Sequence, residues 1–176
     1  MDTFPVLHTP RLLMRKITVG DIPSLVKYAN NKKISGNIIN IPYPYEEPNA
    51  VFRISYVHQG FKNKQRYVFA IILKESEEFI GEISLHLDNQ KNFAEIGYWI
   101  GEPLWNKGIA AEAVKAVLKF GFEKLNLDLI FGNCHTENPA SGKVLKKNGM
   151  KQAGVNGGVA QYRLRKQEFT AISSAK

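Results

Sequence analysis

Residues 104–112 read LWNKGIAAE, a group of small residues that follows an apolar, aromatic stretch and precedes an amphipathic one. From Gly108 to about Leu125 the apolar residues recur at helical spacing, so we expect a helix that begins here and packs on a sheet. The small residues have two interpretations. They let the helix lie close to the sheet, or they leave room for an anion beside Lys107, because the first turn of a helix carries unpaired N–H groups and the positive end of its dipole.

The rest of the chain alternates between strand and helix patterns. We expect strands at residues 9–17, 66–73, 78–88, 93–102, 127–135, 150–155 and 160–169, and helices at 21–31, 49–62 and 138–148. Asp21 should cap the first helix, with Pro23 in its first turn. In the last helix, Asn138 suits the N-cap, Pro139 the first position, and Gly149 the position just past the end.

Two of the expected strands gather polar side chains. In EFIGEISLHLD (78–88) the alternation places Glu82, Ser84 and His86 on one face, and in FAEIGYWIGE (93–102) it places Glu95 on the same side as Trp99. The sequence shows no internal repeat and no linker. It therefore predicts a single domain of the α/β (α+β) class over residues 1–176.

The composition limits what kind of protein this is. Apolar residues make up 44% and charged residues 23%, as in ordinary globular domains, and no apolar run reaches the roughly 18 residues that span a bilayer. The start lacks the pattern of a secretory signal, and the single Cys134 cannot form an internal disulfide, so we expect a cytoplasmic protein without a membrane partner. His58, His86, Cys134 and His135 form no metal-ligand pattern, so we expect no metal.

The chain is basic. Its 24 Lys and Arg against 16 Asp and Glu give a formal net charge of +8, which favours an anionic partner such as a phosphate-bearing ligand. The basic residues are scattered and form no tail, so we expect no dedicated nucleic-acid surface. An RNA or ribosome-associated binding protein is the alternative that this charge leaves open.

Several stretches resemble the GNAT acyltransferases and, within them, the ribosomal-protein N-terminal acetyltransferase branch. The matching stretches, in the family's order, are TPRLLMRK, PYPYEEPNA, FIGEISL, AEIGYWIG, WNKGIAAEA, NPASGKVLKKNGM and YRLRKQEF. The resemblance implies the GNAT acyl-CoA N-acyltransferase fold, a mixed, mostly antiparallel sheet with a splayed central strand pair and about four flanking helices. It also implies an N-acetyltransferase with acetyl-CoA as co-substrate.

The family's cofactor motif, Gln/Arg-x-x-Gly-x-Gly/Ala, falls on residues 105–110. The resemblance implies that the diphosphate of acetyl-CoA lies against the N–H groups from about Lys107 to Ala111. The implied contacts in this segment are Trp105, Asn106, Lys107, Gly108, Ile109, Ala110 and Ala111, and the pantetheine arm would pair with backbone near Trp99, Ile100 and Gly101. Trp105 departs from the motif, and Asn106 stands where the branch often has a flexible glycine.

Asn138 and Ser141 match the branch's Asn-x-x-Ser pattern. The resemblance implies that Asn138 contacts the pantetheine arm and that the Ser141 hydroxyl lies near the sulfur, where it would protonate the leaving thiolate. Helix capping is the alternative for both residues. Lys143 stands where the branch commonly has arginine, and it would meet either a CoA phosphate or water.

The implied reaction is attack of a neutral primary amine on the thioester carbonyl. Glu95 is the candidate base for the acceptor's ammonium group, and a solvated or lysine-paired carboxylate is the alternative. Many GNAT proteins carry a tyrosine and a glutamate at the places held here by Leu145 and Asn133, so neither group can be assumed. A CoA-binding module without turnover is therefore a second alternative.

The acceptor is the least determined part. The stretch 34–48 holds NIPYPYEEP and should be a loop. This loop and the helix after it should select the acceptor, with Tyr43, Tyr45 and Arg53 as wall residues, although plain packing explains them equally well. The acceptor would be a protein N-terminus, that of a ribosomal protein for example, or a small-molecule amine, bound to a monomer or a homodimer.

Overall fold

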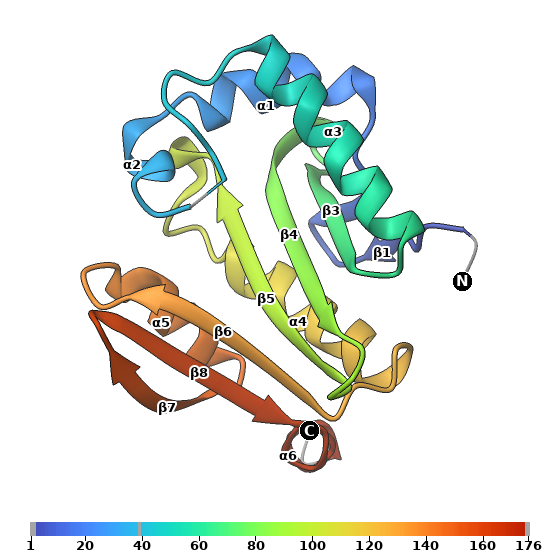
Figure 1. The fold of residues 1–176 in the computed structure, drawn as a ribbon, viewed down its shortest axis with the longest axis vertical. Helices are drawn as coiled ribbons and strands as arrows, with labels where there is room; N and C mark the ends of the chain where they lie inside the picture. Colours follow the sequence, from blue (N-terminus) through green and yellow to red (C-terminus); the bar gives the residue numbers. More distant parts are fainter. Residues whose placement is uncertain (1–2, 39, 175–176) are drawn as a thin grey trace.

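A computed structural model describes residues 3–38 and 40–174, which form an eight-stranded sheet with helices on both faces (Figure 1). The strand order is β1-β2-β3-β4-β5-β6-β8-β7. The strands are β1 (Leu7–His8), β2 (Leu12–Lys16), β3 (Arg66–Leu73), β4 (Glu78–Asp88), β5 (Phe93–Ile100), β6 (Leu129–His135), β7 (Lys151–Asn156) and β8 (Val159–Arg165). Neighbouring strands run antiparallel except β5 and β6, which run parallel.

Helices cover the two faces of this sheet unequally. They are α1 (Ile22–Ala29), α2 (Lys32–Ser35), α3 (Glu47–Lys62), α4 (Ile109–Glu123), α5 (Pro139–Lys147) and α6 (Lys166–Ser174), with single 3₁₀ turns at Val19–Asp21 and Glu102–Leu104. Helices α1 and α3 pack on β3 and β4 from one side, which we call the α3 face, and α4 and α5 pack on β4, β5, β6 and β8 from the other, which we call the α5 face.

The core follows from two sequence patterns. The continuous apolar run of β3 is buried from both faces, and Phe69 and Ile71 in it are fully enclosed. On α4, Ala113 and Val117 are also fully buried, so small side chains do bring this helix close to the sheet. Each large apolar side chain enclosed in this way contributes about 1.5–3 kcal/mol to stability. The rigid frame that results holds the first turn of α4 beside the end of β5.

The parallel pair β5–β6 comes apart after three residues. Phe93, Ala94 and Glu95 pair with Leu129, Ile130 and Phe131, whereas β5 continues to Ile100 and β6 to His135 without pairing to each other. The sequence-based expectation of a splayed central strand pair in a mixed, mostly antiparallel sheet is therefore confirmed. The gap opens toward the end of β5, which leads into α4.

Besides shifts of one or two residues at the ends of elements, the structure differs from the sequence patterns at three places. The single strand expected at residues 9–17 is divided: β1 ends at His8, a turn follows, and β2 begins at Leu12. Residues 166–169, expected to continue the last strand, begin α6 instead, because β8 ends where Arg165 meets the first residue of β6 and Phe169 then stacks on Phe122 with ring centroids 4.9 Å apart. Asp21 is the N-cap residue of α1, as expected, with Pro23 in the first turn, but it makes no side-chain cap bond: its carboxylate accepts hydrogen bonds from Arg15 and from the N–H of Thr18 instead.

The stretch 34–48 is the third place. Its first two residues complete α2 and its last two begin α3, so the irregular part is shorter than expected. Ile39, within this stretch, lies outside the described residues. None of the helices in residues 3–38 and 40–174 has the length and apolar character needed to cross a membrane.

Candidate active site

The loop that enters α4 has two residues with left-handed backbone. Gly108, the N-cap of α4, has φ of 75°, and Asn106 has φ of 60°. Asparagine is among the few side-chain-bearing residues that adopt this region readily, so Asn106 takes the conformation that a glycine would take at this position. Trp105 fixes the loop to the sheet, since its indole N–H donates to the carbonyl of Ile100 at 2.6 Å.

This loop presents unpaired backbone donors. Among the described residues, the N–H groups from Asn106 to Ala111 have no acceptor in the protein, and the first that does is that of Glu112, which donates to the Gly108 carbonyl at 3.1 Å. A Cβ on Gly108 would meet only the Arg11 guanidinium, at 3.5 Å, so the space there is open. Unpaired donors at the positive end of a 15-residue helix suit an anion, and a diphosphate fits this segment.

The edge of β5 that faces the gap also carries free backbone groups. The N–H of Gly101 donates to the Ile80 carbonyl on β4 at 2.8 Å, and alternation along a strand directs Trp99 the same way. The backbones of Tyr98 and Ile100 therefore face the gap. Of the three residues expected to pair with an extended ligand, Ile100 alone directs its backbone toward it, and the carbonyl of Ile100 is already held by Trp105.

Polar residues of β4 and β5 line the α3 face beside the gap, as the alternation predicts. Glu82, 2% exposed, accepts from the Arg53 guanidinium at 2.7 Å and from the Trp99 indole at 3.3 Å. Tyr45 lies near this ion pair and is itself only 2% exposed, and burial raises the pKa of its hydroxyl. The structure thus brings together Tyr45 and Arg53, whereas Tyr43 is half exposed, with the Lys32 ammonium 5.1 Å from its ring centre.

His86 continues this row on β4. Its Nε2 lies 3.1 Å from the Ser84 hydroxyl. Burial, together with the positive charges of Arg66 and Arg53, lowers the pKa of His86 to about 4, against the smaller opposing effect of the negative charge of Glu82. The imidazole is therefore neutral at physiological pH. No group of three or more His, Cys, Asp or Glu side chains among the described residues is arranged to hold a metal ion.

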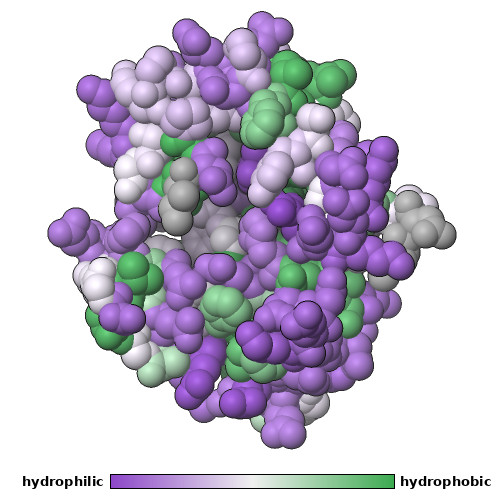
Figure 2. All heavy atoms as spheres, in the orientation of Figure 1, coloured by the Kyte–Doolittle hydropathy of each residue, from purple (hydrophilic) through white to green (hydrophobic). Residues whose placement is uncertain are grey.

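Glu95 sits where β5 and β6 separate. Its Oε1 accepts from the amide of Asn133 at 2.9 Å, and Asn133 in turn accepts from Gln161 at 3.3 Å. It forms no ion pair with any described residue, so the lysine-paired alternative does not hold here. A depression of about 460 Å³ opens beside it, with Phe93 and Phe131 among its walls. Figure 2 shows a separate hollow on this side of the molecule, between the part that holds α2 and the part that holds α5 and β6, toward the end of β5.

On the α5 face, Tyr98 reaches across to Ser141. The two hydroxyl oxygens lie 2.9 Å apart, and the Tyr98 hydroxyl also lies 3.1 Å from the Ser141 carbonyl. Burial raises the pKa of Tyr98 to about 12, so it stays protonated. The sequence patterns did not single out Tyr98. The available signal was its place in AEIGYWIG, one residue after Gly97 and on the opposite face from Glu95.

The other candidates on α5 are placed differently. The Asn138 side chain accepts from the N–H of Ser141 at 3.4 Å, which is the geometry of a helix cap. Lys143 lies on the far side of α5 from Ser141, where it lines a cavity of about 250 Å³ together with Gln152 and Tyr162. Leu145 is buried in the core.

Comparison with known proteins agrees with this geometry. The profile of the acetyltransferase (GNAT) domain family matches residues 11–151. An uncharacterized N-acetyltransferase, p20 of Bacillus licheniformis, is 33% identical over 150 residues, which cover 85% of this chain and 84% of that protein. The ribosomal-protein-serine acetyltransferase of Escherichia coli is 28% identical over 88 residues, 49% of each chain.

Among solved structures, a GNAT-family acetyltransferase from Bacillus anthracis superposes with a TM-score of 0.79 at 25% identity, covering 93% of this chain and 99% of that one. The profile match spans well over half of the sequence, and the splayed strand pair and the open helix terminus lie within it. The chain therefore belongs to the GNAT family of N-acetyltransferases.

Proposed function

We propose that this protein transfers an acetyl group from acetyl-CoA to a primary amine, by direct attack within a ternary complex. The observation that carries the proposal is the position of the open first turn of α4 next to the gap between β5 and β6. The N–H groups from Lys107 to Ala111 would hold the diphosphate, and the free edge of β5 at Tyr98 and Ile100 would pair with the pantetheine arm. Acetyl-CoA supplies the thioester that the amine attacks.

The two faces of β5 divide the chemistry. Glu95, Gly97 and Trp99 point to the α3 face, and Gly97 leaves that face without a side chain at its position. The amine would approach from there, with Glu95 taking the ammonium proton directly or through water. Tyr98 points to the α5 face, where its hydrogen bond would hold the Ser141 hydroxyl in place to protonate the departing thiolate.

Orientation would supply most of the rate. Holding two reactants in a reactive geometry is worth about 7–11 kcal/mol, while a well-placed acid or base adds roughly 10²–10⁴-fold. The rigid frame of α4, β5 and α5 supports this role, since Asn148 at the end of α5 donates to the Ala111 carbonyl in the first turn of α4 at 3.2 Å. The two binding segments are thereby fixed relative to each other.

Two observations bear on the class of acceptor: the name of one relative and the charges on the α3 face. A relative aligned over half of the chain is named for acetylating a ribosomal protein serine, so a peptide that begins with serine is one acceptor to test. On the α3 face of β4 and β5, Glu82 is paired with Arg53, whereas Glu95 has no ion pair with a described residue. The Glu95 carboxylate is thus available to an acceptor that brings an ammonium group.

The test is thiol release from acetyl-CoA in the presence of a panel of amines: peptides with free N-termini, polyamines and amino sugars. We expect at least one of them to stimulate release, and CoA alone to raise the melting temperature. If no amine stimulates release and CoA produces no thermal shift, the proposal is wrong. A thermal shift without stimulated release would support CoA binding and contradict acetyl transfer to these amines.

A further inference from the structure

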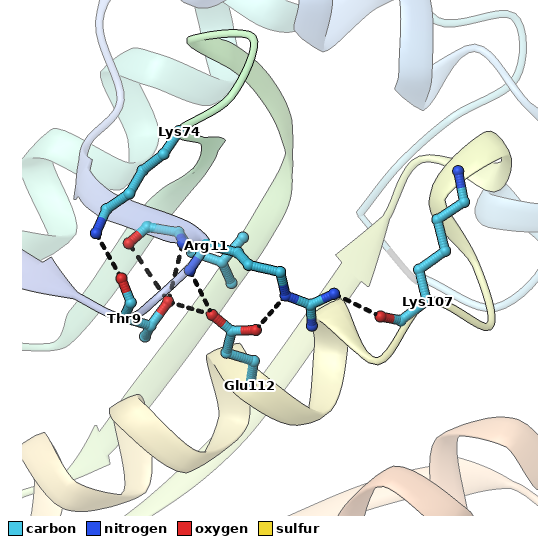
Figure 3. Close-up of polar contacts among 6 residues, drawn as sticks. Thr9, Arg11, Lys74, Lys107 and Glu112 are labelled. Atoms are coloured by element: carbon cyan, nitrogen blue, oxygen red, sulfur yellow. Dashed lines mark hydrogen bonds and ion pairs between the residues drawn. The ribbon is translucent and has the colours of Figure 1, made fainter.

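A compact polar cluster joins the turn between β1 and β2 to the first turn of α4 (Figure 3). Both carboxylate oxygens of Glu112 are engaged. Its Oε1 accepts from the Thr9 hydroxyl at 2.6 Å and from the Arg11 backbone N–H at 2.9 Å, and its Oε2 accepts from Nε of Arg11 at 2.6 Å. We call this set, which joins residues about 100 positions apart in sequence, the Arg11–Glu112 clamp.

The clamp reaches the loop that enters α4. Nη1 of Arg11 donates to the Lys107 carbonyl at 2.8 Å. Lys107 stands between Asn106 and Gly108, the two residues of this loop with left-handed backbone. The bond therefore holds the loop where its backbone conformation is unusual. Figure 3 shows the Lys107 side chain extending away from the clamp, so that its backbone makes the contact and its ammonium group is left for another partner.

One donor of the clamp is unused. Nη2 of Arg11 has no hydrogen-bond partner among the described residues, and it lies 3.5 Å from the point that a Cβ of Gly108 would occupy. The missing side chain of Gly108 therefore leaves a space that is bordered by a free guanidinium N–H on one side and by the unpaired N–H groups of the first helical turn on the other. Charged donors and backbone donors converge there.

The clamp also offsets the negative charge of Glu112. Glu112 lies in the first turn of α4, directly after the last unpaired N–H group, that of Ala111. Burial would raise the pKa of Glu112, but the hydrogen bonds from Thr9 and Arg11 outweigh it and lower the pKa, so the group is ionised. Without Arg11, this carboxylate would repel an anion bound at the helix terminus.

We propose that Arg11 positions the α4 loop and donates through Nη2 to the diphosphate of CoA. This inference rests on the proposed function, because it presumes that the diphosphate binds at this terminus. Arg11 lies near the N-terminal end of the sequence, in the turn between β1 and β2, and is not part of the cofactor motif at residues 105–110. It would act on the diphosphate half of acetyl-CoA and leave the thioester end to other residues.

The experiment compares wild type and Arg11→Gln by calorimetric titration with CoA and with 3′-dephospho-CoA, which keeps the diphosphate and lacks the ribose phosphate. A charge-assisted hydrogen bond is worth roughly 10-fold to 100-fold in affinity, and we expect Arg11→Gln to weaken both ligands by the same factor in that range. Arg11→Lys keeps the charge but cannot bridge Glu112 and Lys107 at once, so it should recover only part of the loss. Arg165→Gln, at an exposed arginine at the end of β8, is the matched control and should bind like wild type.

Steady-state kinetics with two acetyl donors distinguishes a lost contact to the diphosphate from a general loss of folded, active enzyme. The ratio of kcat/KM for acetyl-CoA to kcat/KM for acetyl-pantetheine, which lacks the nucleotide and its diphosphate, should fall by the same 10-fold to 100-fold in Arg11→Gln. An unchanged ratio would overturn the inference, because Arg11 would then support the fold alone. A loss with CoA that is absent with dephospho-CoA would also overturn it, by moving Arg11 to the ribose phosphate. If wild type itself binds neither ligand, it is the proposed function that fails.

Discussion

Glu95 and Tyr98 lie three residues apart on β5 with their side chains on opposite faces of the sheet, the first bonded to Asn133 and the second to Ser141. The pairing of β5 with its parallel neighbour β6 ends at Glu95, so the segment from Glu95 to Tyr98 runs into the gap. A ligand in the gap would therefore have a carboxylate on one side and a pair of hydroxyls on the other. Each of these groups can be removed without disturbing the other, which makes their roles separable.

Replacing Glu95 by glutamine tests the base. Glutamine keeps an oxygen for the Asn133 amide but cannot take a proton, so we expect kcat to fall roughly 10²–10⁴-fold while CoA affinity stays within twofold. Steady-state kinetics with the best amine measures the first and calorimetry the second. Asp88→Asn, in the same depression but paired with Lys91, is the control and should keep its activity. Activity of Glu95→Gln close to that of wild type would exclude Glu95 as the base.

Replacing Tyr98 by phenylalanine removes the hydrogen bond that holds Ser141. The loss of one hydrogen bond, about 1 kcal/mol, should lower kcat several-fold and leave the KM for acetyl-CoA nearly unchanged. Ser141→Ala should cost more, and the double variant no more than Ser141→Ala alone, because the two hydroxyls act as a unit. Tyr162→Phe, on the other side of α5, controls for the loss of a hydroxyl near this helix. Additive losses in the double variant would show that Tyr98 acts independently of Ser141.

Gly108 offers a matched pair of substitutions. Asparagine and aspartate both tolerate the left-handed backbone at φ of 75° and have the same shape, but they differ in charge. We expect both variants to fold, and Gly108→Asp to bind CoA at least 10-fold more weakly than Gly108→Asn, because its carboxylate would face the diphosphate. Titration calorimetry at low and high salt measures the difference, which should shrink as salt rises. Equal affinities at low salt would contradict an anion site at this terminus.

His86 gives the protein a pH-dependent stability. The pKa in the unfolded chain is near 6.5 and in the folded protein about 4, so the unfolded state takes up the proton first as the pH falls. Unfolding free energy should therefore drop between about pH 7.5 and pH 4, by up to roughly 3 kcal/mol. Urea denaturation of wild type and His86→Asn across this range measures it, since other titrating groups cancel in the comparison. The variant should show the shallower dependence, and identical slopes would rule the effect out.

Much of the fold could be predicted from local patterns. Strands β3 and β4 agree with the expected ranges residue for residue, because a continuous apolar run and an alternating one are each bounded by polar turn residues. The end of the last strand could not be predicted. Residues 166–169 leave the sheet because β6, their would-be partner, has no residue left to pair with, and that information lies about 35 positions away in the sequence.

The site shows the same division. Gly108, Ser141 and Glu95 carry signals in their own motifs, and the structure places them around one gap. Tyr98 and Arg11 lie within the matching stretches AEIGYWIG and TPRLLMRK, but no role could be assigned to them from the sequence. Each acts through a partner on another element: Ser141 on α5 for the first, and Glu112 on α4 for the second. A local pattern also could not show that Arg53 would be held by Glu82, a residue on the neighbouring strand β4.

The short pairing of β5 with β6 has a consequence for the mechanics of the whole molecule. Among the described residues, three residue pairs of β5 and β6 link the β1–β5 part of the sheet to the part formed by β6, β8 and β7, and helix α4 and a few side-chain bonds add to them. An extended ligand between β5 and β6 would contact both strands and join these two parts of the sheet. Its binding free energy would therefore also stabilise the folded protein. At a ligand concentration 100 times Kd this amounts to about 2.7 kcal/mol, a large share of the stability of an ordinary domain. The concentration of the co-substrate would then add to the stability that the protein's own contacts give to the junction between these two parts.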